Sequence, residues 1–427
     1  MKKIIRILLE FVSARWLRKW NSREKLEKYQ DKKLEKQIKY FEKKSPYFMK
    51  HKVDLNDFFM NKQFMMENFD ELNTVGVRKD EAFKIAIDGE ETRNFSEKYK
   101  NISVGLSSGT SGHRGMFVTT DDEQSVWAGF ILAKMLPKNK LFGNKIAFFL
   151  RADNNLYKSI NSFFIKLKYF DLFQDFETYV DELNNYNPTI LVAPASMLLV
   201  LCKKKLDGIL KINPIQIISV AEILEKKDEE FIKEVFGVKM VYQIYQATEG
   251  LLGYTCHCGS IHLNEECIKF EKYYIDEKRF YPIISDFRRK SQPFIKYKLN
   301  DILIENKNRC ECGSVFTRID KIEGRSDDIF FFKDKFGKLK KVFPDFIRRC
   351  ILFSEEIREY QVFQVDFDKL EVAVLEIKDF QKKEITKEFD KLFEKLGIEG
   401  VKIDFIEYAP EKNVKLRRIF QKIKKEL

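Results

Sequence analysis

The chain has 427 residues, of which 44% are apolar, so it can bury a full core and form more than one domain. Lys and Arg number 78 against 66 Asp and Glu, and the resulting net charge of +12 suits anionic partners such as nucleotides, nucleic acids or lipid headgroups. Most basic residues stand beside Glu in helical stretches such as Lys25–Lys36, which is typical of solvated helix faces. Because no DNA- or RNA-binding motif occurs, we expect no nucleic-acid partner.

The N-terminus begins Met1-Lys2-Lys3 and continues with apolar residues, as a signal peptide would. Arg6 and Glu10 interrupt the apolar run, however, and no small-residue cleavage site follows. The sequence also lacks an unbroken run of about 18 apolar residues, the minimum for a membrane-spanning helix. We therefore expect a cytoplasmic protein. Residues 1–20 predict a basic amphipathic helix, for which packing on the protein's own core is favoured and peripheral membrane contact stays open.

A charged segment with helical periodicity runs from Glu24 to Lys44 and stops at Ser45-Pro46. It predicts an N-terminal helical segment over residues 1–70. Short apolar runs then alternate with amphipathic helices such as Asp228–Phe236, which predicts an α/β domain with a largely parallel sheet over residues 71–323. The predicted strands are Ile102–Leu106, Lys145–Leu150, Thr189–Ala193, Ile215–Val220 and Met240–Tyr245.

A second domain is expected after Gly324. The segment Ile319–Arg325 is followed by the apolar run Ile329–Phe332, a turn at Gly337 and a new alternation of strands and helices. Residues 324–427 are therefore predicted to form a small α+β domain.

A loop rich in Gly, Ser and Thr follows the first predicted strand, over Ser107-Ser108-Gly109-Thr110-Ser111-Gly112. Glycines allow backbone N–H groups to converge on an anion and hydroxyls add donors, so such a loop can hold ATP phosphates. It lacks the lysine of the GxxxxGK[ST] phosphate loop. A surface turn would have the same composition.

A second polar segment, Tyr245-Gln246-Ala247-Thr248-Glu249, ends a later strand. An aromatic ring can stack on adenine, a Thr hydroxyl can reach a phosphate, and a carboxylate can hold Mg²⁺. Ligands bind at the ends of strands in open parallel sheets, which favours a functional interpretation.

The cysteines suggest a metal site rather than disulfides, because we expect a reducing compartment. Cys256 and His262 in one segment, with Cys310 and Cys312 in another, form an S₃N set suited to tetrahedral Zn²⁺, and Cys258 could replace Cys256. The two segments would be joined without an open coordination position, so a structural role is favoured. Unliganded thiols remain the alternative.

Together the two polar segments resemble the adenylate-forming (AMP-binding) superfamily of acyl-CoA synthetases, luciferases and peptide-synthetase adenylation domains. Four further matches occur in the family's order from about residue 100 to the end. They are Ser219-Val220-Ala221-Glu222, Tyr297-Lys298-Leu299-Asn300-Asp301, Gly324-Arg325-Ser326-Asp327-Asp328 and Lys415-Leu416-Arg417-Arg418.

The resemblance implies a role for each matching segment. Ala221 and Glu222 would line the adenine pocket, Asp301 would hold the ribose hydroxyls, Arg325 would begin an inter-domain hinge, and Lys415 would be a mobile catalytic lysine. The serine-rich loop and the cysteine pairs are most similar to the phenylacetate-CoA ligase branch, which includes deazaflavin-adenylating (coenzyme F) synthetases and capsule-biosynthesis relatives. Gly115 departs from the pattern because many acyl-CoA synthetases have a lysine there, and Arg114 could supply that charge.

The expected activity is ATP- and Mg²⁺-dependent conversion of a carboxylic acid to acyl-AMP, followed by acyl transfer to coenzyme A or a carrier-protein thiol. An adenylyltransferase that leaves AMP on its substrate, and an enzyme with an amine acceptor, are alternatives from the same chemistry. A non-enzymatic scaffold is disfavoured because Thr248, Glu249, Asp301, Arg325 and Lys415 are all present. The sequence identifies neither the acid nor the oligomeric state.

Overall fold

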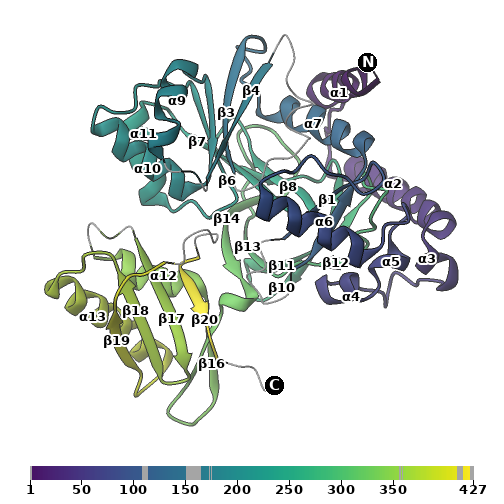
Figure 1. Cartoon of the computed structure of the whole chain (residues 1–427). Coiled ribbons are helices and arrows are strands. Elements are labelled where there is room, and N and C mark those ends of the chain that lie inside the picture. The colour runs from purple at the N-terminus through teal and green to yellow at the C-terminus, as the bar shows by residue number, and fades with distance from the viewer. Residues whose placement is uncertain are drawn as a thin grey trace. The chain divides into compact units, whose positions relative to one another are not determined.

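The computed structural model describes residues 2–107, 114–150, 165–172, 174, 176–354, 357, 359–410 and 417–423. The chain divides into two compact units, and the second contains residues 300–304 and 322–427. The first unit holds all other residues, including the N-terminal helical segment. The predicted class, α/β with a smaller second domain, is confirmed (Figure 1).

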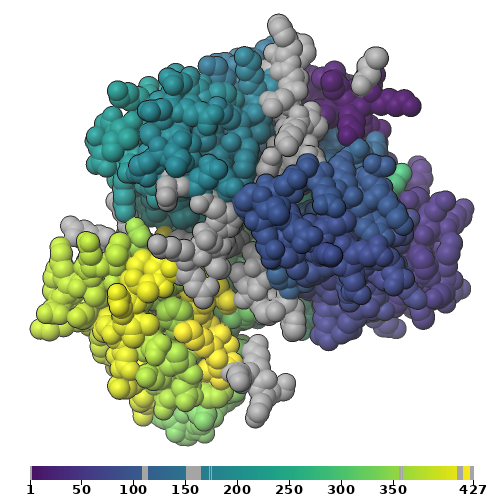
Figure 2. Space-filling view, in the orientation of Figure 1, coloured from purple at the N-terminus to yellow at the C-terminus, as the bar shows by residue number. Residues whose placement is uncertain are grey.

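Helices make up the first part of unit 1, which is coloured from purple to blue in Figure 2. The predicted helix over Glu24–Lys44 is confirmed as α2, whose first turn is capped by the Ser22 side chain accepting from the Lys25 N–H. One face of α2 is buried and includes Leu26, Leu34 and Phe41. The elements are α1 (Lys2–Val12), the π-helical turn η1 (Ser13–Leu17), α2 (Arg23–Lys44), α3 (Pro46–Lys50), α4 (Lys62–Glu67), α5 (Phe69–Leu72) and α6 (Lys79–Thr92).

The amphipathic N-terminal helix packs against the protein's own core, as favoured from the sequence. Ile7 of α1 is buried against α7 (Asp121–Met135). The two helices approach closely at Gly129, where a Cβ atom would lie 2.4 Å from the Ile7 carbonyl oxygen. Arg15 fixes the next turn by donating to the carbonyls of Ala133 and Leu136 at 2.7 and 2.9 Å.

The first predicted strand does not join the parallel sheet. It forms β1 (Ser103–Leu106), which pairs antiparallel with β2 (Met116–Thr119) in a separate two-stranded sheet. Gly105 permits this pairing because a Cβ atom there would lie 2.4 Å from the Phe117 ring. An apolar run of this length gives no information about its partner strand, so the sequence could not distinguish a hairpin from a sheet strand.

The other four predicted strands are confirmed as β3, β5, β6 and β7 of a parallel sheet with the order β4-β3-β5-β6-β7, in which the edge strand β4 was not predicted. Alternate residues of these strands enter two different cores: Ile190 and Val192 pack with α7, whereas Leu191 and Ala193 pack with α9, α10 and α11 on the opposite face. The result is three layers, helix–sheet–helix. The elements are β3 (Asn144–Leu150), β4 (Ile165–Asp171), η2 (Phe176–Thr178), α9 (Val180–Tyr186), β5 (Ile190–Ala193), α10 (Ala195–Leu206), β6 (Gln216–Val220), α11 (Lys226–Phe236) and β7 (Val241–Ala247).

An antiparallel part continues the same sheet beyond β7, which the expectation of a largely parallel sheet did not include. The chain passes between the two units along β13 and β14. These strands are β8 (Gly250–Thr255), β9 (Ile261–Leu263), β10 (Ile268–Tyr274), β11 (Arg279–Asp286), β12 (Tyr297–Lys298), β13 (Asp301–Asn306) and β14 (Arg318–Arg325).

Unit 2 is α+β. Its four-stranded sheet has the order β19-β18-β17-β20, in which β17 and β18 are antiparallel and the outer strands run parallel to their neighbours. Tyr360, Ile347 and Phe389 join the sheet and both helices in one buried core. The elements are η3 (Ser326–Asp328), β15 (Phe330–Lys333), β16 (Leu339–Val342), α12 (Pro344–Leu352), β17 (Tyr360–Asp366), β18 (Lys369–Val374), α13 (Asp379–Leu396), β19 (Lys402–Ile406) and β20 (Ile419–Gln421).

Across the described ranges, every helix is too short or too polar to cross a membrane.

The close contact between α1 and α7 predicts a specific effect of Gly129→Ala. The added methyl would collide with the backbone at Ile7 rather than with a movable side chain, so α1 should be displaced while the sheet stays intact. We expect faster amide hydrogen exchange over residues 2–17 and a small loss of thermal stability. Unchanged protection of α1 would contradict the contact.

Candidate functional site

The turn between β7 and β8 carries two of the side chains predicted to act on ATP. Thr248 donates its hydroxyl to a Glu249 carboxylate oxygen at 2.8 Å, and both residues are half-buried. Gly250 completes the reversal with φ +144°, a conformation that favours glycine. The turn therefore lies at the carboxyl end of the last parallel strand, where ligands bind in open sheets.

A buried arginine that the sequence analysis missed holds this turn. Arg289 donates to the carbonyl oxygens of Thr248 at 3.0 Å and of Glu249 at 3.4 Å, and its other terminal nitrogen donates to Val118 of β2 at 2.9 Å. Burial lowers the pKa of Arg289, and the negative charge of Glu123 opposes that effect. The single guanidinium thus fixes the polar turn relative to the strand that follows the glycine-rich loop.

Glu123 fixes the same region from α7. Its side chain and that of Thr120 form a reciprocal N-terminal cap, and its second oxygen accepts from the backbone N–H groups of Lys290 and Ser291 at 2.6 and 2.8 Å. Burial raises the pKa of Glu123, but these backbone hydrogen bonds and the charge of Arg289 lower it overall. Glu123 therefore stays ionised and holds the loop that presents Arg289.

The ends of the glycine-rich loop are joined to each other. Ser107 donates its backbone N–H to the Gly115 carbonyl, and the Gly115 N–H donates to the Ser107 hydroxyl oxygen, both at 2.7 Å. Ser108, Gly109, Thr110, Ser111 and Gly112 lie outside the described residues.

Near Gly115, the side chain expected to supply a positive charge, that of Arg114, is engaged elsewhere. Arg114 is paired with both carboxylate oxygens of Glu90, at 2.6 and 2.7 Å. Lys62, at the start of α4, lies over Gly115 instead, since a Cβ atom there would be 3.1 Å from the Lys62 Cε. Glycine at this position leaves room for a lysine that comes from a different element.

The predicted adenine-binding residues lie at the ends of the two neighbouring strands β6 and β7. Ala221 follows β6 with φ +65°, an unusual value for a residue with a Cβ atom that marks a strained turn. Glu222 accepts from the Ser196 N–H at 2.9 Å, at the start of α10. Tyr245 is buried in β7, whereas Gln246 is exposed.

Unit 2 contains the predicted ribose and hinge residues. Asp301 and Arg325 form an ion pair at 3.6 Å. The predicted hinge is also joined to the C-terminal segment, because Arg417 donates through Nε to Asp328 at 2.7 Å. Burial raises the pKa of Asp328, and the charge of Arg417 opposes the rise. Lys415 itself lies outside the described residues.

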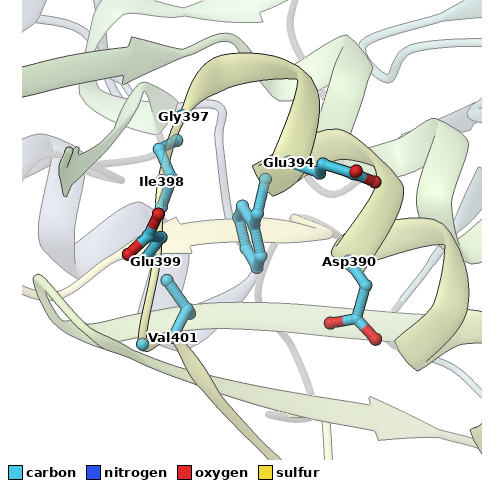
Figure 3. Close-up of a pocket in the computed structure, with 8 residues that line it drawn as sticks. Asp390, Glu394, Gly397, Ile398, Glu399 and Val401 are labelled. Atoms are coloured by element: carbon cyan, nitrogen blue, oxygen red, sulfur yellow. The ribbon is translucent and has the colours of Figure 1, made fainter. Parts of the chain in front are cut away.

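A hollow of about 320 Å³ is present in unit 2 where α13 ends (Figure 3). Acidic side chains line much of it, including Asp390, Glu394 and Glu399. None of the residues predicted from the sequence to act on a substrate lines it.

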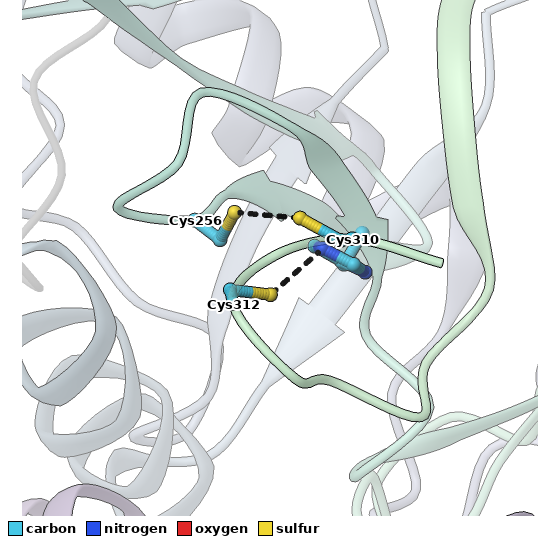
Figure 4. Close-up of side chains that lie close together, drawn as sticks. Cys256, Cys310 and Cys312 are labelled. Carbon is cyan, nitrogen blue, oxygen red and sulfur yellow. Dashed lines mark hydrogen bonds between the residues drawn. The ribbon is translucent and has the colours of Figure 1, made fainter. Parts of the chain in front are cut away.

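The cysteine and histidine segments come together in unit 1. The possible ligand atoms of Cys256, His262, Cys310 and Cys312 all lie within 4.8 Å of one another. The sulfur atoms of Cys256 and Cys310 are 3.7 Å apart, and the Cys312 sulfur is 3.4 Å from His262 Nε2 (Figure 4). Cys258 is exposed and does not belong to this group.

The two shorter separations fit zinc. A tetrahedral centre with ordinary Zn–S and Zn–N bonds places its sulfur ligands about 3.8 Å apart and sulfur and nitrogen about 3.6 Å apart. His262 Nδ1 lies 3.2 Å from the Phe316 carbonyl oxygen, so a proton on Nδ1 would leave Nε2 available to the metal. Four protein ligands fill a tetrahedral site, which is the pattern of structural rather than catalytic zinc.

Comparisons with known proteins show which fold these elements form. No family model matches the sequence, and no curated protein sequence matches it significantly. Among solved structures, 2-hydroxyisobutyryl-CoA ligase with its acyl-AMP is similar with a TM-score of 0.70 at 13% identity, covering 94% of this chain and 90% of that one. Anthranilate CoA ligase AuaEII with anthranoyl-AMP gives 0.53 at 13% identity, over 74% of this chain and 66% of that one.

A third similar structure is the amide bond synthetase McbA from Marinactinospora thermotolerans, with a TM-score of 0.51 at 12% identity, covering 74% of this chain and 68% of that one. Identities this low establish the fold alone. The chain therefore has the fold found in acyl-CoA ligases.

If the group of Cys256, His262, Cys310 and Cys312 binds zinc, Cys310→Ser should lower both zinc content and stability. Protein purified without chelator should contain about one zinc ion per chain by elemental analysis, and the variant should lose most of it together with several degrees of melting temperature. Cys258→Ser is the matched control and should retain the metal. Zinc-free wild-type protein, or equal loss in the two variants, would refute the assignment.

The buried guanidinium predicts a large effect of Arg289→Met. The substitution removes the donors to three carbonyl groups and leaves Glu123 without its buried counter-charge. The free energy of unfolding should therefore fall by about 3–5 kcal/mol. Urea denaturation measures this change. Arg279→Met, which removes the ion pair with the exposed Asp276, should cost about 0–1 kcal/mol; similar losses would argue against the central role of Arg289.

Proposed function

We propose that this chain, which has the fold of acyl-CoA ligases, uses ATP to convert a carboxylic acid to its acyl-AMP, releases pyrophosphate, and passes the acyl group to a thiol. The acceptor would be coenzyme A or a carrier-protein thiol. The observation that carries the proposal is the Thr248-Glu249 turn, held by Arg289 at the carboxyl end of the parallel strands. Two of the compared structures hold an acyl-AMP.

The chemistry needs positioning and charge stabilisation rather than a covalent enzyme intermediate. The substrate carboxylate is ionised at neutral pH and attacks the α-phosphorus without a general base, so the protein must place the two reactants and offset charge on the phosphates. We propose that the Thr248 hydroxyl donates a hydrogen bond to a phosphate of ATP and that the Glu249 carboxylate binds Mg²⁺. Mg²⁺ bound there would neutralise charge on the phosphates. Arg289 is a positioning residue, because its guanidinium donates to the backbone carbonyls of the turn.

The remaining binding roles follow the matched segments. The loop Ser107–Gly112 is proposed to hold the phosphates, and the ends of β6 and β7 to hold adenine. Asp301 is proposed to bind the ribose hydroxyls, and Arg325 to begin the hinge between the domains. The adenine residues are Ala221, Glu222, Tyr245 and Gln246.

Lys62 is a further candidate for the phosphate site. It lies over Gly115, the position at which the family resemblance predicts a lysine. A lysine from α4 could therefore supply the missing positive charge. In the exchange assay described next, Lys62→Gln should raise the KM for ATP more than Lys84→Gln, on the exposed side of α6.

An amine acceptor is the second candidate, since an amide bond synthetase is among the similar structures. An adenylyltransferase that leaves AMP on its substrate would share the first half-reaction.

The first half-reaction can be tested by ATP–pyrophosphate exchange with panels of aryl, fatty and amino acids. At least one acid should support exchange and the release of pyrophosphate rather than phosphate, because the attack is at the α-phosphorus and AMP stays joined to the acyl group until an acceptor displaces it. Supplying coenzyme A or an amine afterwards then separates the acceptors. Formation of ADP would exclude adenylation.

Lys415 is the proposed cation of the first step, by its place in the resemblance. Lys415→Ala should lower the rate of acyl-AMP formation about 10²- to 10⁴-fold. Thioester formation from acyl-AMP that is supplied to the enzyme should continue. Quenched-flow measurements of each half-reaction distinguish the two effects. Equal loss in both halves would indicate a structural lysine, and no loss in either would remove Lys415 from the mechanism.

A further inference from the structure

The N-terminal helix exposes an apolar stripe on the side that does not pack. In a helix, residues three and four apart share a face, and five apolar residues of α1 with two of η1 form one such exposed face. We call these residues the outer stripe. They are Ile4, Ile5, Leu8, Leu9, Val12, Trp16 and Leu17, with exposed fractions between 40% and 70%.

Most of the outer stripe faces away from the core, although Trp16 also makes an edge-on ring contact with Phe11. The opposite side of the helix supplies the packing, through Ile7, Phe11 and Ala14. The packed side of α1 is held against α7 by the close approach at Gly129 and by the hydrogen bonds of Arg15. Rotation of α1 to bury the outer stripe would break these contacts. Apolar residues that a helix exposes beside its packed face mark a surface for interaction with a partner.

The charge around the stripe indicates the partner. Residues 2–19 contain six basic residues against one acidic residue. Lys3 and Arg6 pair with Asp121 and Asp122 of α7, while Lys2 and Lys19 are exposed near the two ends of the stripe. Basic residues beside a row of Leu, Ile and Trp are the composition of helices that lie in the interface of anionic membranes.

We propose that the outer stripe lies in the headgroup region of an anionic lipid bilayer, with α1 parallel to the membrane plane. The apolar side chains enter the boundary of the acyl chains, and Lys2 and Lys19 contact acidic headgroups. A second copy of the chain fits less well, because pairing two stripes brings the exposed Lys2 and Lys19 of both copies together. The proposal concerns location and does not depend on the adenylation chemistry.

Vesicle co-sedimentation of the full chain tests the proposal. The protein should sediment with vesicles of phosphatidylcholine and phosphatidylserine, bind less to phosphatidylcholine alone, and be released in part by high salt. The double variant Ile5→Asp, Leu9→Asp should reduce the partition coefficient at least tenfold, and Lys19→Glu should reduce it for anionic vesicles only. Because Ile5 and Leu9 are 51% and 61% exposed, the double variant should keep the wild-type melting temperature.

The matched control is Leu206→Asp, which changes an equally exposed leucine, 65% accessible at the end of α10. This variant should bind vesicles as the wild type does. Failure of the wild-type protein to bind anionic vesicles would overturn the proposal, as would equal binding of the double variant. A dimer in light scattering that the double variant dissociates, without vesicle binding, would assign the stripe to a second copy instead.

Discussion

The buried guanidinium of Arg289 is the constraint on which the arrangement of unit 1 depends. A charge this deep in the protein is tolerated only where hydrogen bonds and counter-charges replace water. Here these come from two regions distant in sequence from Arg289: Val118 of β2 with Glu123 of the following helix α7, and the turn at Thr248. The donors therefore fix the geometry of the turn more tightly than an apolar contact would.

The group of Cys256, His262, Cys310 and Cys312 has a comparable role, because it brings the loop with Cys310 and Cys312 to β9. Glu265 follows β9, which carries the ligand His262. Its carboxylate accepts from the Thr317 N–H, just after the loop with Cys310 and Cys312, and pairs with Arg23 at the start of α2 at 2.7 Å. Gln30 of α2 donates to the Glu265 carbonyl at 2.7 Å. Helix α2 and the segment after the cysteine loop are thus joined through Glu265, by its carboxylate and its backbone carbonyl, and a structural metal would reinforce this connection.

In unit 2 the predicted hinge and the segment after Lys415 meet through Arg417 and Asp328. The pair is largely buried, so the start of β20 is anchored at the hinge rather than at the sheet alone. Any movement of residues 326–328 would therefore be transmitted to the C-terminal segment, which gives the proposed mobile lysine a physical connection to the hinge.

The sequence alone determined the features that are encoded locally. Periodicity gave α2 and the strands β3, β5, β6 and β7, because burying one or both faces of an element requires a fixed spacing of apolar residues. The four proposed metal ligands were recognisable because sulfur and imidazole have few other common uses in such a pattern. Tertiary structure decided what depends on partners far along the chain: the pairing of β1 with β2, the antiparallel half of the sheet, and the close approach at Gly129. Arg289 and Lys62 also could not be found beforehand, because an arginine or a lysine in a basic chain looks like any other until the fold buries it or places it beside a glycine.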